Sequence, residues 1–374
     1  MSAVPTTPSA AKPGVSDVSV VINGTAWKGW QSVRITRGCE RMPADFQLSV
    51  TEKYPGSASE IDIQPFQPCV VRIGSDTVIT GYVDRYVGTI EGDNHTVEII
   101  GRSKSQDLVD CSAVLPMMAI SNVNAVALGN QLGKDYGITV SALGAPPSQV
   151  LPKFNVTLGE TPYEILERVA RYCQVLLYDG TDGNVILAQV GSVTAASGFV
   201  QGVNVERASV TFRGDERFSV YMCSTVNTAF LSDQGDAKYF LPSVPDTTVP
   251  RLRRKLIVSE QTINGKSLAE ARASWEMARR IGRSQAVTLT CDSWRDAAGA
   301  LWAPNTLAPV TLPALKLVNK KWVISEVTYA KDDRGTRAEV TLMPPSAFQP
   351  QPDPLQPFDW QVSRAIAQSG AGKP

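Results

Sequence analysis

Short runs of β-branched residues separated by polar turns dominate the stretch Pro65–Ser103. Cys69–Ile73 is one such run, and the turn Gly74–Asp76 separates it from a second run at Val78–Val87. A third run lies at His95–Ile100. Runs of this length bounded by glycine, serine and aspartate are typical of β-strands. The stretch therefore predicts a set of antiparallel strands.

A similar pattern returns near the other end of the chain. The repeated segments have similar lengths, follow the same order and are joined by polar turns. Pro304–Leu312 resembles Pro65–Ile73, Trp322–Tyr329 resembles Val78–Arg85, and Arg337–Leu342 resembles Thr96–Ile100. Self-similarity at a distance is the signature of duplicated units. We therefore expect a small β-barrel or sandwich that occurs twice in the chain.

The first β-unit begins close to the N-terminus. Residues Met1–Ser16 are rich in Pro, Ser, Thr and Ala and have no periodicity, which predicts a flexible arm over residues 1–16. Val18–Ile22 is followed by Asn23 and Gly24, the strongest two-residue hairpin signal. Two more alternating runs follow before Pro65. Together these strands predict a first β-barrel domain over residues 17–104.

The hydrophobic period changes to that of helices after residue 104. Ser121 is a candidate cap for a helix over residues 121–133. A clearer helix starts at Thr161, because Pro162 suits the first turn and Glu164 completes a capping box. A hairpin is expected around residues 180–183. These elements predict an α/β module over residues 105–195.

The β pattern then restarts and predicts a second β-barrel domain over residues 196–345. Residues 227–250 form a polar insertion to which the pattern assigns no structure. The strongest helix signal covers residues 267–283, where Ser267 and Glu270 form a capping box. Its apolar face is expected to hold Leu268, Ala271, Trp275, Ala278 and Ile281. Repeated prolines predict a stiff C-terminal tail over residues 346–374.

Composition narrows the class of protein. A chain of 374 residues is too long for one core and predicts two to four domains. Its formal net charge of zero argues against a surface that binds polyanions over its whole extent. The sequence contains no apolar run as long as a membrane span and no signal peptide. The six cysteines form no Cys-x-x-Cys pair and predict free thiols in a reducing cytoplasm.

Reactive groups do not converge anywhere along the chain. The single histidine, His95, excludes a multi-histidine metal site and leaves at most one imidazole base. The acid pairs Asp107 with Asp110 and Glu164 with Glu167 are spaced for one helical face, but no other reactive groups gather around them. Phosphate-binding loops and nucleophile elbows are absent from the sequence. We therefore predict no catalytic, cofactor or metal site, and a protein that is not an enzyme.

The remaining candidates are groups that contact other molecules. A basic cluster contains Arg251, Arg253, Arg254 and Lys255. It is either a solvated loop or the lining of a channel, where it would face passing DNA without tight binding. The aromatic candidates are Trp27, Trp30, Phe358 and Trp360. Trp27 and Trp30 are core residues or interface anchors, and the two aromatics of the tail are expected to dock on another surface.

Four long segments carry a resemblance to a known family. They are WKGWQSVRITRGCERMPADFQLSVTEKYPG, ITGYVDRY, GRSKSQDLVDCSA and WVISEVTYAKDDRGTRAEVTLMPPSAF. These segments resemble the baseplate hub proteins of Mu-like contractile-tailed phages, also called the phage tail protein D or late control family. The resemblance covers essentially Val18–Phe348, and leaves out the arm and the tail.

The resemblance implies a fold and a set of partners. It implies a mainly β protein in which two similar small β-barrels flank an α/β module, and a homotrimer whose six barrels form a pseudo-sixfold ring. Such a ring would join the sixfold tail tube to the threefold central spike, contact other baseplate proteins and surround a DNA channel. The protein would belong to the virion baseplate and would be assembled in the cytoplasm of the host bacterium. The α/β module would contact the spike or a neighbouring subunit, and the family brings no catalytic residues.

Three alternatives stay open on the sequence alone. The first is the hub of a bacterial contractile injection system, which would share the fold and differ in its cargo or fused spike. The second is a cell-wall hydrolase, which requires a cleft with paired acids and a clearing band in a zymogram. The third is a monomeric multidomain binding protein.

Overall fold

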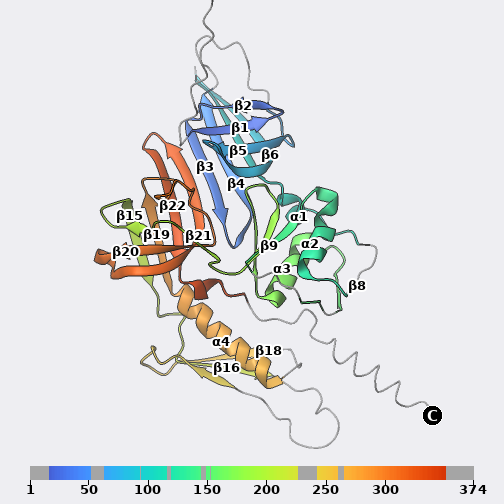
Figure 1. Ribbon diagram of the computed structural model, residues 1–374, viewed down its shortest axis with the longest axis vertical. Helices are drawn as coiled ribbons and strands as arrows, with labels where there is room; N and C mark the ends of the chain where they lie inside the picture. Colours follow the sequence, from blue (N-terminus) through green and yellow to red (C-terminus); the bar gives the residue numbers. More distant parts are fainter. Residues whose placement is uncertain are drawn as a thin grey trace, which may run out of the picture.

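Most strands of the protein belong to one large sheet. The computed structural model describes residues 17–51, 63–92, 94–115, 119–144, 149–151, 153–225, 242–259 and 265–350. Fourteen strands form the sheet, and its longest path runs in the order β15-β19-β22-β21-β3-β4-β7-β6-β5-β1-β2. Figure 1 shows the sheet as a block of blue strands beside a block of orange ones. The expectation of a mainly β protein with few helices is confirmed.

The first block contains the strands predicted from the N-terminal third of the chain. The Asn23-Gly24 turn joins β1 to β2, with positive φ at both residues as a two-residue hairpin requires. The order of the five main strands is β3-β4-β7-β6-β5. The strands are β1 (Val18–Ile22), β2 (Thr25–Trp27), β3 (Ser32–Gly38), β4 (Arg41–Thr51), β5 (Pro68–Ile73), β6 (Asp76–Glu91) and β7 (Asn94–Ser103).

The second block repeats this order with strands from the C-terminal half. Its five main strands lie in the order β15-β19-β22-β21-β20. Two short strands, β13 and β14, pair with the outer side of β20. The strands are β13 (Val193–Thr194), β14 (Phe199–Val200), β15 (Val205–Phe212), β19 (Gln285–Cys291), β20 (Thr306–Leu312), β21 (Leu317–Asp332) and β22 (Gly335–Met343).

The two blocks share their strand register residue by residue. In β6 and β7, Val83 lies opposite Gly101 and Arg85 opposite Ile100, so a bulge falls between them. In β21 and β22 the same bulge separates Ile324 opposite Leu342 from Glu326 opposite Thr341. Each of these four residues of the first unit precedes its equivalent in the second by the same number of residues. The equivalent pairs are Val83 and Ile324, Arg85 and Glu326, Ile100 and Thr341, and Gly101 and Leu342. The pairing of β4 with β7 and of β19 with β22 follows this constant offset. The fold is therefore built on a duplicated five-stranded unit.

This register corrects one part of the sequence comparison. The similarity of Trp322–Tyr329 to Val78–Arg85 implies an offset that is too large by three positions, whereas that of Arg337–Leu342 to Thr96–Ile100 has the observed offset. A shift by an odd number would exchange the two faces of the strand. The similarity of side chains between the two strands therefore did not fix their register.

The two units are joined rather than separated. The second half of β21 pairs with β3 in an antiparallel ladder from Glu326 opposite Gly38 to Lys331 opposite Val33. Within the described residues the path of paired strands stays open from β15 to β2, so two closed barrels are not found. One hydrophobic core continues through both units, with Phe46 and Ile35 from the first and Tyr329 and Trp302 from the second.

The α/β module packs beside the first unit. The helix predicted at Thr161 is confirmed as α3, with the Thr161 hydroxyl and the Glu164 carboxylate forming both arms of the capping box. The helix predicted from Ser121 begins later, because the Asn124 side chain accepts the capping hydrogen bond from Ala127. The elements are α1 (Gln106–Asp110), β8 (Ala119–Ile120), α2 (Ala125–Gly133), η1 (Lys134–Tyr136), β9 (Val140–Leu143), β10 (Phe154–Asn155), α3 (Pro162–Cys173), β11 (Leu176–Asp179) and β12 (Val185–Ala188).

A further subdomain interrupts the second unit. In the first unit a turn at Cys39 and Glu40 joins β3 to β4, whereas residues 213–284 stand between the equivalent strands β15 and β19. Three strands pack on a long helix there, below the main sheet in Figure 1. The elements are β16 (Val220–Thr225), β17 (Ser243–Pro245), β18 (Arg254–Ser259) and α4 (Gly265–Arg283), and η3 (Pro313–Leu315) and η4 (Pro345–Phe348) complete the fold.

The prediction for α4 is correct in extent but wrong in its cap and face. The helix starts at Gly265, so Ser267 lies inside it and does not cap it. Ala269 and Ala273 are the buried residues that face Tyr221 and Cys223, whereas Ala271 is exposed. The strands of this subdomain pack against the small alanine side chains of α4. The buried face of the helix therefore differs from the apolar face expected from the sequence.

The cysteines are free thiols, as the sequence predicts. Cys39, Cys69, Cys223 and Cys291 are buried. Burial raises the pKa of the Cys39 and Cys69 thiols to about 12. These thiols therefore stay protonated at neutral pH and behave as small apolar core residues. None of the helices in the described residues is long and apolar enough to cross a membrane.

Candidate assembly surfaces

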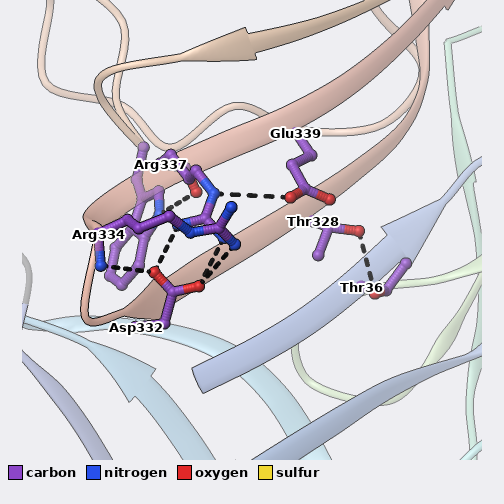
Figure 2. A network of polar contacts seen from close by, with 7 residues as sticks. Thr36, Thr328, Asp332, Arg334, Arg337 and Glu339 are labelled. Carbon is purple, nitrogen blue, oxygen red and sulfur yellow. Dashed lines mark hydrogen bonds and ion pairs between the residues drawn. The ribbon is translucent and has the colours of Figure 1, made fainter. Parts of the chain in front are cut away.

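The ladder between β21 and β3 is the internal junction of the two units, and it is closely packed. Ile35 and Tyr329 lie opposite each other with no exposed surface. Beside them Thr36 and Thr328 form a buried hydrogen bond between their hydroxyl groups at 3.1 Å (Figure 2). The Tyr329 hydroxyl donates to the backbone carbonyl of Trp302. Apolar burial and these two hydrogen bonds together stabilise this junction.

A charged network closes one end of the junction at the turn between β21 and β22. Asp332 accepts hydrogen bonds from Arg337 at 2.7 Å and from Arg334 at 3.0 Å (Figure 2). These guanidinium groups, Arg337 first, hold the pKa of the Asp332 carboxyl well below its usual range. Glu339 lies 3.7 Å from Arg337 on its other side. The network fixes the turn next to the start of β3.

A buried carboxylate attaches the α/β module to the first unit. Asp179, at the end of β11, is almost fully buried and accepts hydrogen bonds from the backbone N–H of Ala44 and the hydroxyl of Ser105, both at 3.0 Å. Arg37 is also buried and donates to the backbone carbonyl of Asp179 at 3.3 Å. These hydrogen bonds satisfy a polar side chain that is shielded from water. The module is therefore held in place beside β3 and β4.

The subdomain between β15 and β19 is attached to the first unit through Glu40. The Glu40 carboxylate pairs with Arg279 at 3.3 Å and with Arg283, both on α4. The guanidinium groups of Arg272 and Arg279 lie 4.8 and 5.6 Å from the centre of the Trp275 ring. The Trp275 indole N–H donates to the backbone carbonyl of Gln349 at 2.7 Å. Glu40 and Trp275 border a cleft of about 310 Å³ between α3 and α4. Trp275 is therefore a partly buried anchor and not the core residue expected from the helix pattern.

Two strand edges of the main sheet lack the partner that the internal junction supplies. Strand β15 pairs only with β19, so its outer edge from Arg207 to Phe212 has no neighbouring strand among the described residues. Strand β6 pairs with β5 only as far as Tyr82, and beyond that point the described strands pair with it on one side only, through β7. Large apolar side chains are exposed along these edges: Phe66 is 90%, Ile90 77%, Phe212 54% and Val87 40% exposed.

The residues singled out from the sequence lie in different environments. Trp30 is 3% exposed and belongs to the core, and its indole N–H donates to the backbone carbonyl of Trp27 at 3.3 Å. Trp30 is therefore not available as an interface anchor, whereas Trp27 is partly exposed. Phe358 and Trp360 lie outside the described residues.

The basic cluster does not form one uniform surface. Arg251 and Arg254 are exposed. Arg253 donates to the backbone carbonyls of Gly214 at 2.8 Å and Asp215 at 2.6 Å and lies over the Phe218 ring. The ammonium group of Lys255 is 5.7 Å from the centre of the same ring. Arg253 and Lys255 therefore stabilise the subdomain, and only the other two point to solvent.

The acid pairs of the sequence have separate structural partners. Asp110 pairs with Arg102 at 2.8 Å, and Arg102 also pairs with Asp84, the residue that forms the bulge in β6. Glu167 pairs with Arg171. Groups of three or more potential metal ligands are absent from the residues that the structure describes.

The open strand edges were not found from the sequence, because they become visible only when the register of both units is known.

Three family models match separate parts of the chain. Residues 17–103 match the family described as Mu phage baseplate assembly protein GpP-like, N-terminal. Residues 105–189 match the second domain of baseplate hub protein gp44-like, and residues 265–351 match the fourth domain of Mu phage baseplate assembly protein GpP.

Similar whole proteins are also known. The chain is 29% identical over 341 residues to baseplate hub protein gp44 of Escherichia phage Mu, covering 88% of each. It is 30% identical to the 43 kDa tail protein of prophage MuSo2 from Shewanella oneidensis, with a TM-score of 0.80 and coverage of 90% of this chain and 99% of that one. An E. coli component of the type VI secretion system shares the fold at 11% identity, with a TM-score of 0.57 over 90% of this chain and 80% of that one. The chain belongs to the family of baseplate hub proteins of Mu-like phages.

Proposed function

We propose that three copies of this baseplate hub protein form a ring that joins the tail tube to the central spike. The observation that supports the ring is the duplicated unit, whose two copies share one strand register at a constant sequence offset. Two equivalent units in each of three chains present six similar surfaces toward a sixfold tube, while the chains themselves keep the threefold symmetry of a spike. The protein then acts through assembly and transfer of load, with no chemical turnover.

The ring surrounds the channel through which DNA passes. The exposed arginines Arg251 and Arg254 face this channel or the solvent around it, and two isolated charges are too few for tight binding of a polyanion. Trp27, on the edge strand β2, and the tail aromatics Phe358 and Trp360 are the proposed contacts with other baseplate proteins. The domain limits at residues 16, 104, 195 and 345 also stay proposals.

A hub of a bacterial contractile injection system is the second candidate. The shared fold with the type VI component and with the Francisella PdpA–VgrG complex favours this candidate. These likenesses are at 11% and 10% identity, whereas those to the Mu-like proteins are at 29% and 30%. The phage tail is therefore the function that the comparisons support better.

The mass of the purified chain in solution tests the ring. Light scattering coupled to size exclusion is expected to give three times the 40.3 kDa of one chain. Averaged micrographs of the same sample should show six densities around a channel. A sample that stays monomeric at high concentration, alone and with a tail-tube or spike protein added, would contradict the proposal.

A further inference from the structure

The internal junction between the two units has an unused counterpart at the ends of the same sheet. In the junction, the second half of β21 pairs with β3. The equivalent of β21 in the first unit is β6, and the equivalent of β3 in the second unit is β15. Neither of these has its matching partner within the described part of the chain. Among the described residues, one chain therefore carries an unpaired copy of each side of the junction.

The geometry at β6 shows that its edge opens at the right place. In the second unit, the backbone N–H of Asn305 donates to the carbonyl of Ile324 at 2.8 Å, and β3 takes over the edge from that point. In the first unit, the N–H of Phe66 donates to the carbonyl of Val83 at 2.7 Å. Phe66 and Asn305 both have positive φ, at 71° and 60°. The segments before β5 and β20 therefore contact β6 and β21 in the same way. Beyond Val83, none of the described strands pairs with this edge of β6.

The geometry at β15 matches in the same manner. In the first unit Val33 lies opposite Leu48 and Thr36 opposite Asp45. In the second unit Ala208 lies opposite Leu289 and Thr211 opposite Ala286. Since Leu289 and Ala286 are the equivalents of Leu48 and Asp45 at the constant offset of the two units, β15 is in register with β3. Its outer edge therefore presents backbone groups in the order that β3 presents to β21.

We infer that β6 of one chain pairs with β15 of a second copy, in the register of the internal junction. Transfer of that register places Thr89 opposite Ser209, Gly88 opposite Val210 and Val87 opposite Thr211. The contact is head-to-tail, so each copy uses one edge of each kind, and repetition closes a ring when the rotation allows it. This inference rests on the proposed ring and names the surface that forms it.

Burial and side-chain shape agree with this pairing. The junction residues Ile35, Thr36 and Tyr329 have no exposed surface, whereas Val87 and Ile90 on the open edge are among the exposed large apolar residues. A Cβ atom at Gly88 would have its nearest neighbours in the side chains of Tyr86 and His95, at 3.5–3.9 Å. In the transferred register, Phe212 lies diagonally across from Gly88 on the same face. Aromatic side chains commonly cover such edge glycines. Long exposed edges with apolar side chains are otherwise a hazard for aggregation, which strand pairing removes.

Register-specific disulfide formation tests the inference. In antiparallel strands, directly opposite residues have Cα atoms about 4.5–5.5 Å apart, within the range of a disulfide. The double variant Thr89→Cys/Ser209→Cys should form covalent dimers and trimers on mild oxidation. In the sheet of one chain β6 and β15 are seven strand positions apart, roughly 34 Å along the sheet, so we expect the link between chains. The mass of the linked species distinguishes dimers and trimers from a link within one chain.

Matched controls separate the register from simple proximity. Thr89→Cys/Thr211→Cys moves one partner by two residues to a distance of about 7–8 Å, and it should give much less linked product. The single variants and the unaltered chain, oxidised in parallel, account for the partly exposed Cys111 and Cys173. Peptide mass spectrometry of the linked species should show residues 89 and 209 joined.

A second variant measures the contribution of the edges to assembly. Ile90→Lys/Phe212→Lys should raise the concentration at half-assembly by about 100-fold or more, because both side chains would become buried at the contact. Val318→Lys, on the central strand β21 with 61% exposure, should not change it. A trimeric mass without the 89–209 link would overturn the β6–β15 pairing and leave the hub function intact. A monomeric mass without the link, also with a tail-tube or spike protein added, would overturn both.

Discussion

The internal junction and the two open edges present the same strand framework with different side chains. At the junction, Tyr329 lies opposite Ile35, and Thr328 lies beside Thr36 with a hydrogen bond between them. At the equivalent positions of the open edges, Gly88 replaces Tyr329 and Val87 replaces Thr328. The backbone of the duplicated unit thus kept its register while its side chains diverged. At these positions the internal junction holds a large side chain and a hydrogen bond between side chains, whereas the open edge of β6 holds smaller apolar residues.

This difference is what a chain that assembles after folding requires. A junction formed during folding can bury large side chains completely, because its two strands are covalently connected. An edge that waits for a second copy must stay soluble until it pairs, and an uncovered tyrosine–isoleucine pair would favour aggregation. The comparison therefore predicts that substitutions at the junction change the stability of one chain, and substitutions at the edges change association.

The largest expected effect on stability comes from Tyr329. Tyr329→Ala removes a fully buried ring and leaves the carbonyl of Trp302 without its hydroxyl donor. The free energy of unfolding should fall by about 3–5 kcal/mol, the range for large-to-small changes in a core. Urea unfolding followed by tryptophan fluorescence measures this loss.

The equivalent position in the first unit supplies the matched control for Tyr329. Gly88→Ala adds a Cβ atom to an edge residue, at an ordinary van der Waals distance of 3.5 Å or more from the nearest side chains, those of Tyr86 and His95. It should alter the unfolding free energy by less than about 1 kcal/mol. Equal losses for the two variants would show that the junction and the edge do not differ in the way described.

The sequence predicted features that depend on neighbours in the chain. The cap at Thr161 and the hairpin at Asn23-Gly24 are local hydrogen-bonding and φ preferences, and both are confirmed. The cap at Ser267 was wrong, because residues from Gly265 onward already have helical structure. The family and its mainly β fold were also recognisable, since long segments carry the resemblance.

Pairings between distant strands were beyond the reach of the sequence pattern. The ladder that begins with Glu326 opposite Gly38 joins strands from opposite ends of the chain, and alternation alone fits more than one register. For the same reason the sequence suggested two closed barrels where the described strands form one open sheet. The candidate edges at Val87 and Phe212 follow from this topology and were therefore not predicted.

A smaller effect is expected at the charged turn that closes the junction. The depressed pKa of Asp332 means that its ionised form stabilises the fold. This stabilisation is fully present above the unfolded pKa of 3.8 and is lost as the pH falls through the lower folded value. Asp332→Asn should lower the thermal midpoint slightly at neutral pH, and the difference from the unaltered chain should shrink in strong acid. Because the Asp332 side chain is partly exposed to solvent, salt should also reduce the difference. A difference that grows as the pH falls would contradict this role of Asp332.

The smallest effect on assembly is expected from the basic cluster, which lies on neither the junction nor the open edges. Arg251→Gln/Arg254→Gln removes two exposed charges, and full neutralisation of Arg251–Lys255 removes four. Light scattering should give the same trimeric mass for both variants. Full neutralisation should lower the thermal midpoint more, because Arg253 donates to the carbonyls of Gly214 and Asp215. These carbonyls belong to residues just after the end of β15. If the trimer is lost only in the variant that also neutralises Arg253, then Arg253 supports the β15 edge by stabilising its own subdomain. Loss of the trimer in Arg251→Gln/Arg254→Gln would instead place the exposed arginines in the contact between chains, and the strand edges alone would then not account for assembly.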